Sequence, residues 1–420
     1  MAEPSHWRRE RVVNRARLAA VALAAILAVA LLALVGWPGR EYRNGDFFQY
    51  YAGAVAVASG ASPYDRRWTA EFAARQGSAA LHVPPQPASG DPSWTTPYPL
   101  YLFIAILPIA FLPLDAAAAA WLVAQALCVV AGLAFVSRPL RSATRRGGWL
   151  IAGIALGFQP LWLLPGNGNI TGFLFGAVAG AVGMTLRGRP MAAGAFLAIC
   201  AVKPQSLVLV AIALLIVTPA GERRRLIGGA ALVGLPLLVS AFAFQPGWMS
   251  AWIDAAAALQ RTRFSNATGW TIDRIAAGIP LVASPVAVGV AAAALALWWW
   301  RLRPAPAWAI AAAIPISVFA APHGWTYEQL YLLFSATVVI GAIGAMGCAH
   351  PARRFLLLGA VAVAFGPIPW GLYAWDLMRN GEEASAIVPL VVFAVVVLGQ
   401  RVTASPPQRV PHAASATALH

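Results

Sequence analysis

The chain has 420 residues, of which 60% are hydrophobic and only 11% are charged. A soluble chain of this length carries about 25% charged residues, so a globular fold could not hide this much apolar surface from water, and soluble proteins are excluded. The formal net charge of +15 does not indicate nucleic acid, because the arginines lie in short clusters between apolar runs, as in membrane proteins. The sequence therefore predicts an all-α polytopic membrane protein with no nucleic acid among its partners.

The first apolar run, 18–36, follows an arginine-rich segment, 1–17. This run is longer than the apolar core of a signal peptide, and no cleavage site of small residues follows it before Trp37. We therefore expect a retained first transmembrane helix. The positive charge that precedes it places the N-terminus, 1–17, in the cytoplasm.

The next segment, 37–97, is then a loop outside the membrane. Apolar and aromatic side chains recur at helical spacing between 48 and 55, and Trp68 and Phe72 lie on one helical face further along. This pattern predicts two short amphipathic helices that lie on the outer membrane surface.

Apolar segments follow this loop almost to the C-terminus. They lie at roughly 98–113, 116–137, 149–164, 169–186, 191–202, 205–218, 226–244, 281–300, 305–321, 328–347, 354–374 and 385–400. We expect one membrane domain, 18–400, with about 12–13 transmembrane segments. The count stays open because 98–113 is short, contains Pro108 and Pro113, and either crosses fully or forms a half-crossing helix. The tail, 401–420, is predicted to be a disordered cytoplasmic end.

Arginine clusters between the apolar segments predict which loops face the cytoplasm. These clusters are Arg138–Arg146, Arg187–Arg189, Arg223–Arg225, Arg301–Arg303 and Arg353–Arg354. The same rule places four further loops outside, at 165–168, 245–280, 322–327 and 376–384. We therefore expect a multi-pass protein of the plasma (inner) membrane with its polar loops facing the periplasm or exterior.

Lys203 and Pro204 separate two apolar segments, each shorter than the ~20 residues that a full span needs. Irregular backbone at membrane depth is stable only where it lines a protein cavity or water. Lys203 is also the only lysine among 30 basic residues. It is either a cation for a phosphate or carboxylate in an outward-facing cavity, or a lysine that extends from a helix end to the interface.

Asp46 lies shortly after the first apolar run, at the start of the first predicted surface helix. An aspartate there can cap the helix and offset its dipole. It can also act as a general base, held where a polar acceptor would reach it. The two roles are compatible.

Two other external loops concentrate polar side chains. Asn167 and Asn169 alternate with glycines, which predicts either an ordinary turn or an amide-lined site. His323, Trp325 and Glu328 lie in another short link; a lone histidine in a loop is usually solvated, but a carboxylate at the head of a span needs a partner or water. By the charge rule all these clusters lie on the external side, which predicts a site there.

The cysteines and histidines indicate no metal site. Cys128, Cys200 and Cys348 lie in apolar runs, and no cysteine or histidine spacing typical of a metal site occurs. We therefore expect neither a metal nor another cofactor.

A series of short motifs occurs in a fixed order across about 40–345. The motifs are Asp46, Tyr50-Tyr51, Gly60, Tyr64-Asp65, Tyr98-Pro99, Gly168-Asn169, Lys203-Pro204 and Pro322-His323-Gly324-Trp325. This order resembles glycosyltransferase family 87 of the GT-C fold, which includes polyprenyl-phosphate-mannose-dependent mannosyltransferases that elongate phosphatidylinositol mannosides. The resemblance implies a GT-C-type helical bundle with the first external loop carrying surface helices.

The resemblance also implies roles for individual residues. Asp46 would take the proton of the acceptor hydroxyl as it attacks the anomeric carbon, and Lys203 would neutralise the departing polyprenyl phosphate. The remaining candidates are His323 and Glu328 as further catalytic residues, and Tyr98, Asn167, Asn169 and Trp325 as substrate-binding residues.

These implications predict an integral membrane glycosyltransferase. It would move mannose or a similar hexose or pentose from a polyprenyl-phosphate donor to a lipid-linked or cell-envelope acceptor on the external face. The alternative is a multi-spanning lipid or glycolipid transporter or flippase, which would share the span count and the broken helix. Transporters commonly interrupt matching helices in two halves, and the break at Lys203 has no clear mate in the sequence.

Cysteine labelling tests the predicted topology. Ser89→Cys, in the external loop, should react with a membrane-impermeant maleimide on intact cells. Ser142→Cys, in a cytoplasmic arginine cluster, should react only after the cells are permeabilised. Equal labelling of both positions from outside would contradict the assignment of sides.

Overall fold

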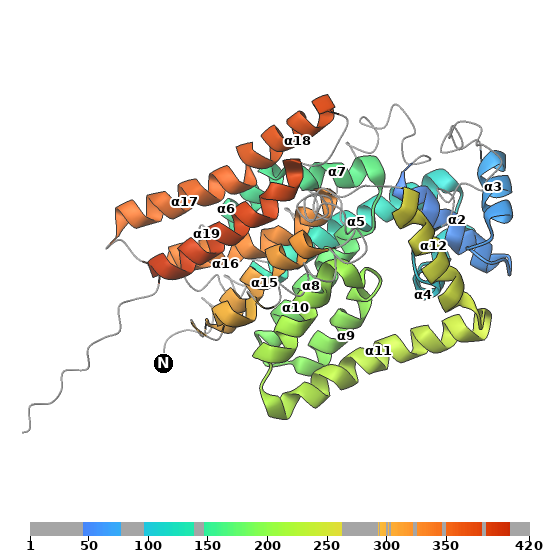
Figure 1. Cartoon of the computed structure of the whole chain (residues 1–420), viewed down its shortest axis with the longest axis horizontal. Helices are drawn as coiled ribbons and strands as arrows, with labels where there is room; N and C mark the ends of the chain where they lie inside the picture. The colour runs from blue at the N-terminus through green and yellow to red at the C-terminus, as the bar shows by residue number, and fades with distance from the viewer. Residues whose placement is uncertain are drawn as a thin grey trace, which may run out of the picture.

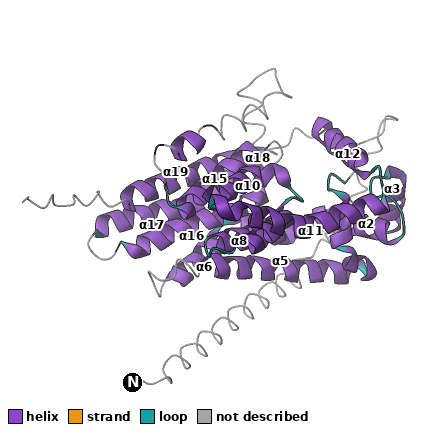
Figure 2. Ribbon diagram, turned by 90° about the horizontal axis from the view of Figure 1, so that it is seen from below, coloured by secondary structure: helices purple, strands orange, loops and turns teal. Residues whose placement is uncertain are grey.

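A computed structural model describes residues 45–76, 96–137, 147–262, 293, 295–299, 301, 304–321, 326–346, 350–379 and 384–403. Every regular element in these ranges is a helix, and none of them is a strand, as Figure 2 shows. The predicted all-α fold is therefore confirmed. The predicted first transmembrane helix, the cytoplasmic N-terminus and the C-terminal tail beyond 403 lie outside the described residues and stay predictions.

The helices follow one another through short links. The α-helices are α2 (Asp46–Ala58), α3 (Arg66–Arg75), α4 (Leu100–Ala105), α5 (Leu114–Ser137), α6 (Gly147–Gly157), α7 (Gln159–Asn167), α8 (Thr171–Thr185), α9 (Pro190–Cys200), α10 (Pro204–Val217), α11 (Arg223–Phe244), α12 (Trp248–Thr262), α15 (Pro306–Ala320), α16 (Leu333–Ala345), α17 (Pro351–Phe365), α18 (Pro367–Arg379) and α19 (Ile387–Thr403). The 3₁₀ helices are η4 (Leu107–Phe111), η6 (Ala220–Glu222), η7 (Thr326–Leu332) and η8 (Ala384–Ala386). Figure 1 shows α2, α3, α4 and α12 at one end of the molecule and α17 and α19 at the other.

Four of the described helical stretches are long and apolar enough to cross a membrane. They are Leu114–Ser137, Ala220–Phe244, Thr326–Ala345 and Pro351–Met378. A bent pair, Leu150–Gly157 and Gln159–Asn167, makes a fifth span if its two halves, which meet at 58°, cross together. Shorter apolar helices accompany them, so the chain is a polytopic membrane protein. The total of 12–13 segments stays a prediction, because 1–44 and 263–292 lie outside the described residues.

The stretch Thr326–Ala345, formed by η7 and α16, lies at the centre of the bundle. Its most apolar window is 78% buried, against 17–33% for the other long spans. Helices α15, α17 and α19 pack against α16, and α7, α8 and α15 pack against η7. Because η7 begins this stretch, any polar residue on it is surrounded by protein.

The first helix of the predicted external loop is largely buried in the protein, which corrects the prediction that it lies on the membrane surface. Nine of the thirteen residues of α2 are buried, and the helix packs against α4, η4 and α5. Its aromatic residues point to more than one side: the rings of Phe47 and Tyr50 contact Trp121 of α5, with centroids 5.8 and 5.3 Å away, whereas the ring of Phe48 stacks on Phe72 of α3 at 6.0 Å. The second predicted helix is confirmed as α3, which buries only Phe72 and Ala73.

The helix break at Lys203 is confirmed. Helix α9 ends at Cys200 and α10 begins at Pro204, so the backbone between them is not helical. The break sends the two halves to different partners, because α9 packs against α8 and α11 whereas α10 packs against α15. The segment 98–113 is likewise not one helix: α4 and η4 divide it, and neither is long enough to cross a membrane.

Helices α9 and α11 approach each other through glycines. A Cβ atom on Gly194 of α9 would meet the carbonyl oxygen of Leu226, and a Cβ on Gly229 of α11 would meet that of Met191, both well inside contact distance. Small residues at such crossings let membrane helices pack backbone against backbone.

This crossing predicts opposite effects for two adjacent glycines. Gly229→Ala should destabilise the protein by about 1–3 kcal/mol, the usual cost of overpacking. Gly228→Ala is the matched control, because a Cβ there meets nothing within 4 Å and alanine favours a helix by about 0.5–1 kcal/mol over glycine. Thermal unfolding in detergent should show a lower Tm for Gly229→Ala alone; equal Tm values for both variants would contradict this packing.

Candidate active site

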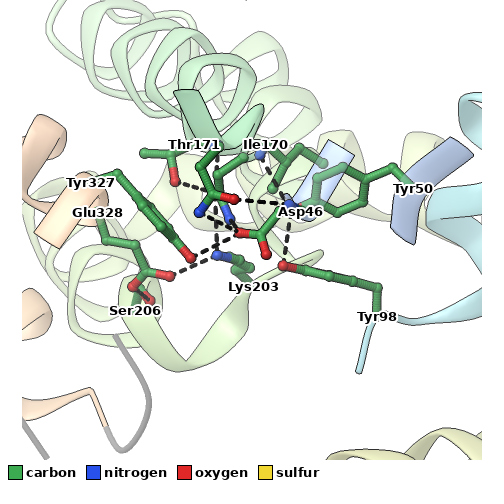
Figure 3. Close-up of polar contacts among 11 residues, drawn as sticks. Asp46, Tyr50, Tyr98, Ile170, Thr171, Lys203, Ser206, Tyr327 and Glu328 are labelled. Atoms are coloured by element: carbon green, nitrogen blue, oxygen red, sulfur yellow. Dashed lines mark hydrogen bonds and ion pairs between the residues drawn. The ribbon is translucent and has the colours of Figure 1, made fainter. Parts of the chain in front are cut away.

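Polar residues from four separate segments meet at the N-terminus of α2 (Figure 3). Asp46 opens α2, Asn169 lies between α7 and α8, Lys203 lies at the break before α10, and Glu328 belongs to η7. Hydrogen bonds connect all four in the order Asp46, Asn169, Lys203, Glu328. These four residues therefore meet as predicted, and the roles predicted for them stay predictions.

The two carboxylate oxygens of Asp46 have different surroundings. Oδ2 accepts hydrogen bonds from the amide of Asn167 at 3.2 Å, from the phenol of Tyr327 at 3.0 Å and from the amide of Asn169. Among the described residues, none donates to Oδ1. The side chain is half-buried. Asp46 is therefore held through Oδ2, whereas Oδ1 has no donor among the described residues.

Asp46 does not cap α2, so that part of the prediction is wrong, although it lies in the first turn of the helix, where a negative charge offsets the helix dipole. The N-cap residue is Gly45, which has no side chain that could accept a hydrogen bond from the first turn of the helix. Instead, Oδ1 of Asn167 accepts the backbone N–H of Asp46 at 2.8 Å. Asn167 thus satisfies the helix end and leaves the Asp46 carboxylate for other contacts.

The turn that presents both asparagines depends on Gly168. This residue ends α7 with φ +66°, in the left-handed region that favours glycine. A Cβ at Gly168 would lie 2.5 Å from Cβ of Phe47, and its carbonyl accepts the indole N–H of Trp121 at 2.7 Å. The turn is therefore fixed against α2 and α5, with Asn167 and Asn169 on either side of Asp46.

Lys203 and Glu328 form an ion pair inside the protein. The ammonium Nζ lies 2.7 Å from Oε1 of Glu328, and the two side chains are 4% and 0% exposed. The hydroxyl of Ser206 donates to Oε2 of Glu328 at 2.6 Å, and the rings of Tyr98 and Tyr327 lie 5.8 and 5.3 Å from Nζ. The alternative of a lysine extending to the membrane interface is therefore wrong, because the ammonium lies inside the site.

The phenol of Tyr98 forms a hydrogen bond with the phenol of Tyr50 beside the site. The hydroxyl of Tyr50 donates to that of Tyr98 at 2.8 Å and accepts the backbone N–H of Ile170 at 3.3 Å. Burial raises the pKa of the Tyr50 phenol well above its ordinary value, so Tyr50 stays a neutral donor. The backbone carbonyl of Tyr98 is in turn held by the hydroxyl of Tyr64 at 2.8 Å.

Two predicted site residues, His323 and Trp325, lie outside the described residues. Conversely, Tyr327, Thr171 and Ser206 contact the site without having been predicted. Tyr327 lies in a loop that the sequence did mark as polar, and Thr171 closely follows Asn169. Nothing in the sequence marks Ser206. In the part of the chain that the structure describes, no group of three or more His, Cys, Asp and Glu residues is placed to hold a metal ion.

One comparison with known proteins gives a match. The sequence model of glycosyltransferase family 87 matches residues 94–335. This segment contains Tyr98, both asparagines, Lys203 and Glu328, and it begins after Asp46. No curated protein matches the chain.

The buried ion pair predicts a stability test. Lys203→Met should lower the free energy of unfolding by about 3–5 kcal/mol, because it leaves the Glu328 carboxylate buried without a counter-charge. The double variant Lys203→Met/Glu328→Gln should recover most of this loss, since it removes both charges. Chemical or thermal unfolding in detergent measures both; a single variant as stable as wild type would contradict a charged, buried pair.

Proposed function

Because the chain belongs to glycosyltransferase family 87, we propose that it transfers a sugar from a polyprenyl-phosphate donor to a lipid-linked or cell-envelope acceptor on the external face of the membrane. The family makes it a membrane glycosyltransferase, which favours an enzyme over a transporter or flippase. The sugar that we propose is mannose or a similar hexose or pentose.

The observation that carries this proposal is the asymmetric setting of Asp46. Three donors hold Oδ2, which fixes the direction of the carboxylate. In the proposed reaction the acceptor hydroxyl binds at Oδ1 and gives its proton to Asp46 as its oxygen attacks the anomeric carbon. The bond from that carbon to the phosphate oxygen breaks, its electron pair leaves with the phosphate, and the configuration at the carbon inverts.

Lys203 is the proposed contact for the departing phosphate. Its pairing with Glu328 does not argue against this role, because the ion-paired lysine of protein kinases also contacts phosphates. Two of the three ammonium donors are directed to Glu328 and Asn169, which leaves one for the ligand. Loss of a charge-assisted contact of about 1.5–3 kcal/mol should weaken donor binding about tenfold to a hundredfold in the folded Lys203→Met/Glu328→Gln variant.

A lipid-linked donor suits the position of the site. The site lies among apolar helices, and the chain exposes many large apolar side chains, such as Val239 of α11 and Phe355 of α17, to the surroundings of the bundle. A polyprenyl phosphate keeps its chain in lipid and brings its head group to the interface. Tyr98, Asn167 and Asn169 are then the proposed contacts for the sugar and its acceptor, with His323 and Trp325 as further candidates.

Asp46→Asn tests the proposed base. The amide keeps the shape of the side chain and removes the proton acceptor, so turnover should fall by about 10²–10⁴-fold, while the Tm stays near that of wild type. The assay follows sugar transfer from polyprenyl-phosphate mannose to the lipid fraction of membranes, with mass spectrometry of the glycolipid product.

Asp65→Asn is the matched control for this experiment. Asp65 caps α3 by accepting the backbone N–H groups of Arg67 and Trp68, and asparagine caps a helix about as well as aspartate. This variant should therefore transfer sugar at the wild-type rate. If Asp46→Asn did the same, the catalytic role of Asp46 would be refuted.

A further inference from the structure

We propose that Thr171 is a positioning residue for Asp46 and acts through Asn169. Its hydroxyl donates to the oxygen of the Asn169 amide and so helps to hold this amide in place, with the NH₂ group facing the carboxylate. This inference rests on the proposed function, because it gives Thr171 a kinetic role only if Asp46 is the base.

The contacts of Asn169 determine which end of its amide faces Asp46. On the side away from Asp46, its oxygen Oδ1 accepts the backbone N–H of Thr171 at 3.1 Å and the Thr171 hydroxyl at 2.6 Å, and the ammonium of Lys203 lies 3.4 Å away. A backbone N–H and an ammonium can only donate. The atom that faces them must therefore be the oxygen, and the nitrogen must face Oδ2 of Asp46.

The reversed amide would be costly in this setting. It would place the amide oxygen against the Asp46 carboxylate, and the NH₂ group against the backbone N–H of Thr171 and the ammonium of Lys203, neither of which can accept a hydrogen bond. Asn169 and Thr171 are both fully buried, so water cannot compensate for unmade hydrogen bonds, and buried unsatisfied polar groups are expensive. Thr171 supplies one of these two donors through its backbone N–H, and its hydroxyl adds the shortest hydrogen bond to the same oxygen of Asn169, at 2.6 Å.

The hydroxyl of Thr171 makes a hydrogen bond that is not part of the ordinary local turn. The bond from the Asn169 side chain to the backbone N–H two residues later is a common turn at the start of a helix. Valine at position 171 would retain that bond. The additional hydrogen bond, from the Thr171 hydroxyl to Asn169, is not needed to form this turn. The experiment removes this bond alone.

The test compares Thr171→Val, which removes the hydroxyl at constant shape, with Thr171→Ser, which retains it. One neutral hydrogen bond corresponds to about a twofold to tenfold change, so kcat should fall by that factor in Thr171→Val while the KM for polyprenyl-phosphate mannose stays unchanged. Thr171→Ser should restore kcat. Thr185→Val is the matched control: its hydroxyl, on the same helix, donates to the Ala181 carbonyl, and its kcat should equal that of wild type.

A double-mutant cycle with Asn169→Ala separates a positioning role from a general loss of stability. If Thr171 acts through Asn169, adding Thr171→Val to Asn169→Ala should cause no further fall in kcat. A wild-type kcat in Thr171→Val, or a full additional fall in the double variant, would overturn the inference. If Thr171→Val does not accumulate as folded protein, Thr171→Ala enters the same cycle.

Asp46→Asn, measured in the same assay, distinguishes this inference from the proposed function. An inactive Asp46→Asn together with a wild-type Thr171→Val would refute the role of Thr171 alone. An active Asp46→Asn would refute the proposed base, and with it the reason for any kinetic effect of Thr171.

Discussion

The buried ion pair between Lys203 and Glu328 is the interaction on which the site depends. Removing two charges from water costs several kcal/mol each, and their attraction compensates only with good geometry and additional hydrogen bonds. Here Ser206 bonds the second oxygen of Glu328, and the Ser206 carbonyl accepts a hydrogen bond from Ser317 of α15. The pair thus ties the helix break before α10 to η7, and Ser206 ties it to α15.

The position of Asp46 follows from a second constraint, the burial of α2. Phe47 and Tyr50 pack on Trp121 of α5, and Gly168 allows the turn after α7 to lie against Phe47. The start of α2 therefore packs between α5 and the turn that contains Asn169. Asn169 then joins the two constraints, because its oxygen faces Lys203 and its nitrogen faces Asp46. A carboxylate held in this way is preorganised for the role of base that we propose for it.

The sequence predicts the all-α membrane fold, the break at Lys203 and the gathering of polar loops, because hydropathy, proline chemistry and the distribution of arginines are local properties of the chain. It does not predict that α2 is buried on most of its sides. Helical spacing reveals one apolar face, but it gives no information about the helices that pack on the other faces. Nor does it reveal that Glu328 pairs with Lys203, 125 positions away, because such a choice of partner is made only in the folded bundle. Thr171 and Ser206 are hidden for the same reason: hydroxyl residues are common in apolar helices, and only the fold shows which ones meet an amide or a carboxylate.

A structure of the protein with bound polyprenyl-phosphate mannose, trapped in Asp46→Asn, tests the central claim most directly. The account predicts that the phosphate contacts the Lys203 ammonium and that the anomeric carbon lies beside position 46, with room for an acceptor oxygen about 3–3.5 Å from that carbon. A donor whose head group binds elsewhere in the bundle, with no contact to position 46 or to Lys203, would contradict the account.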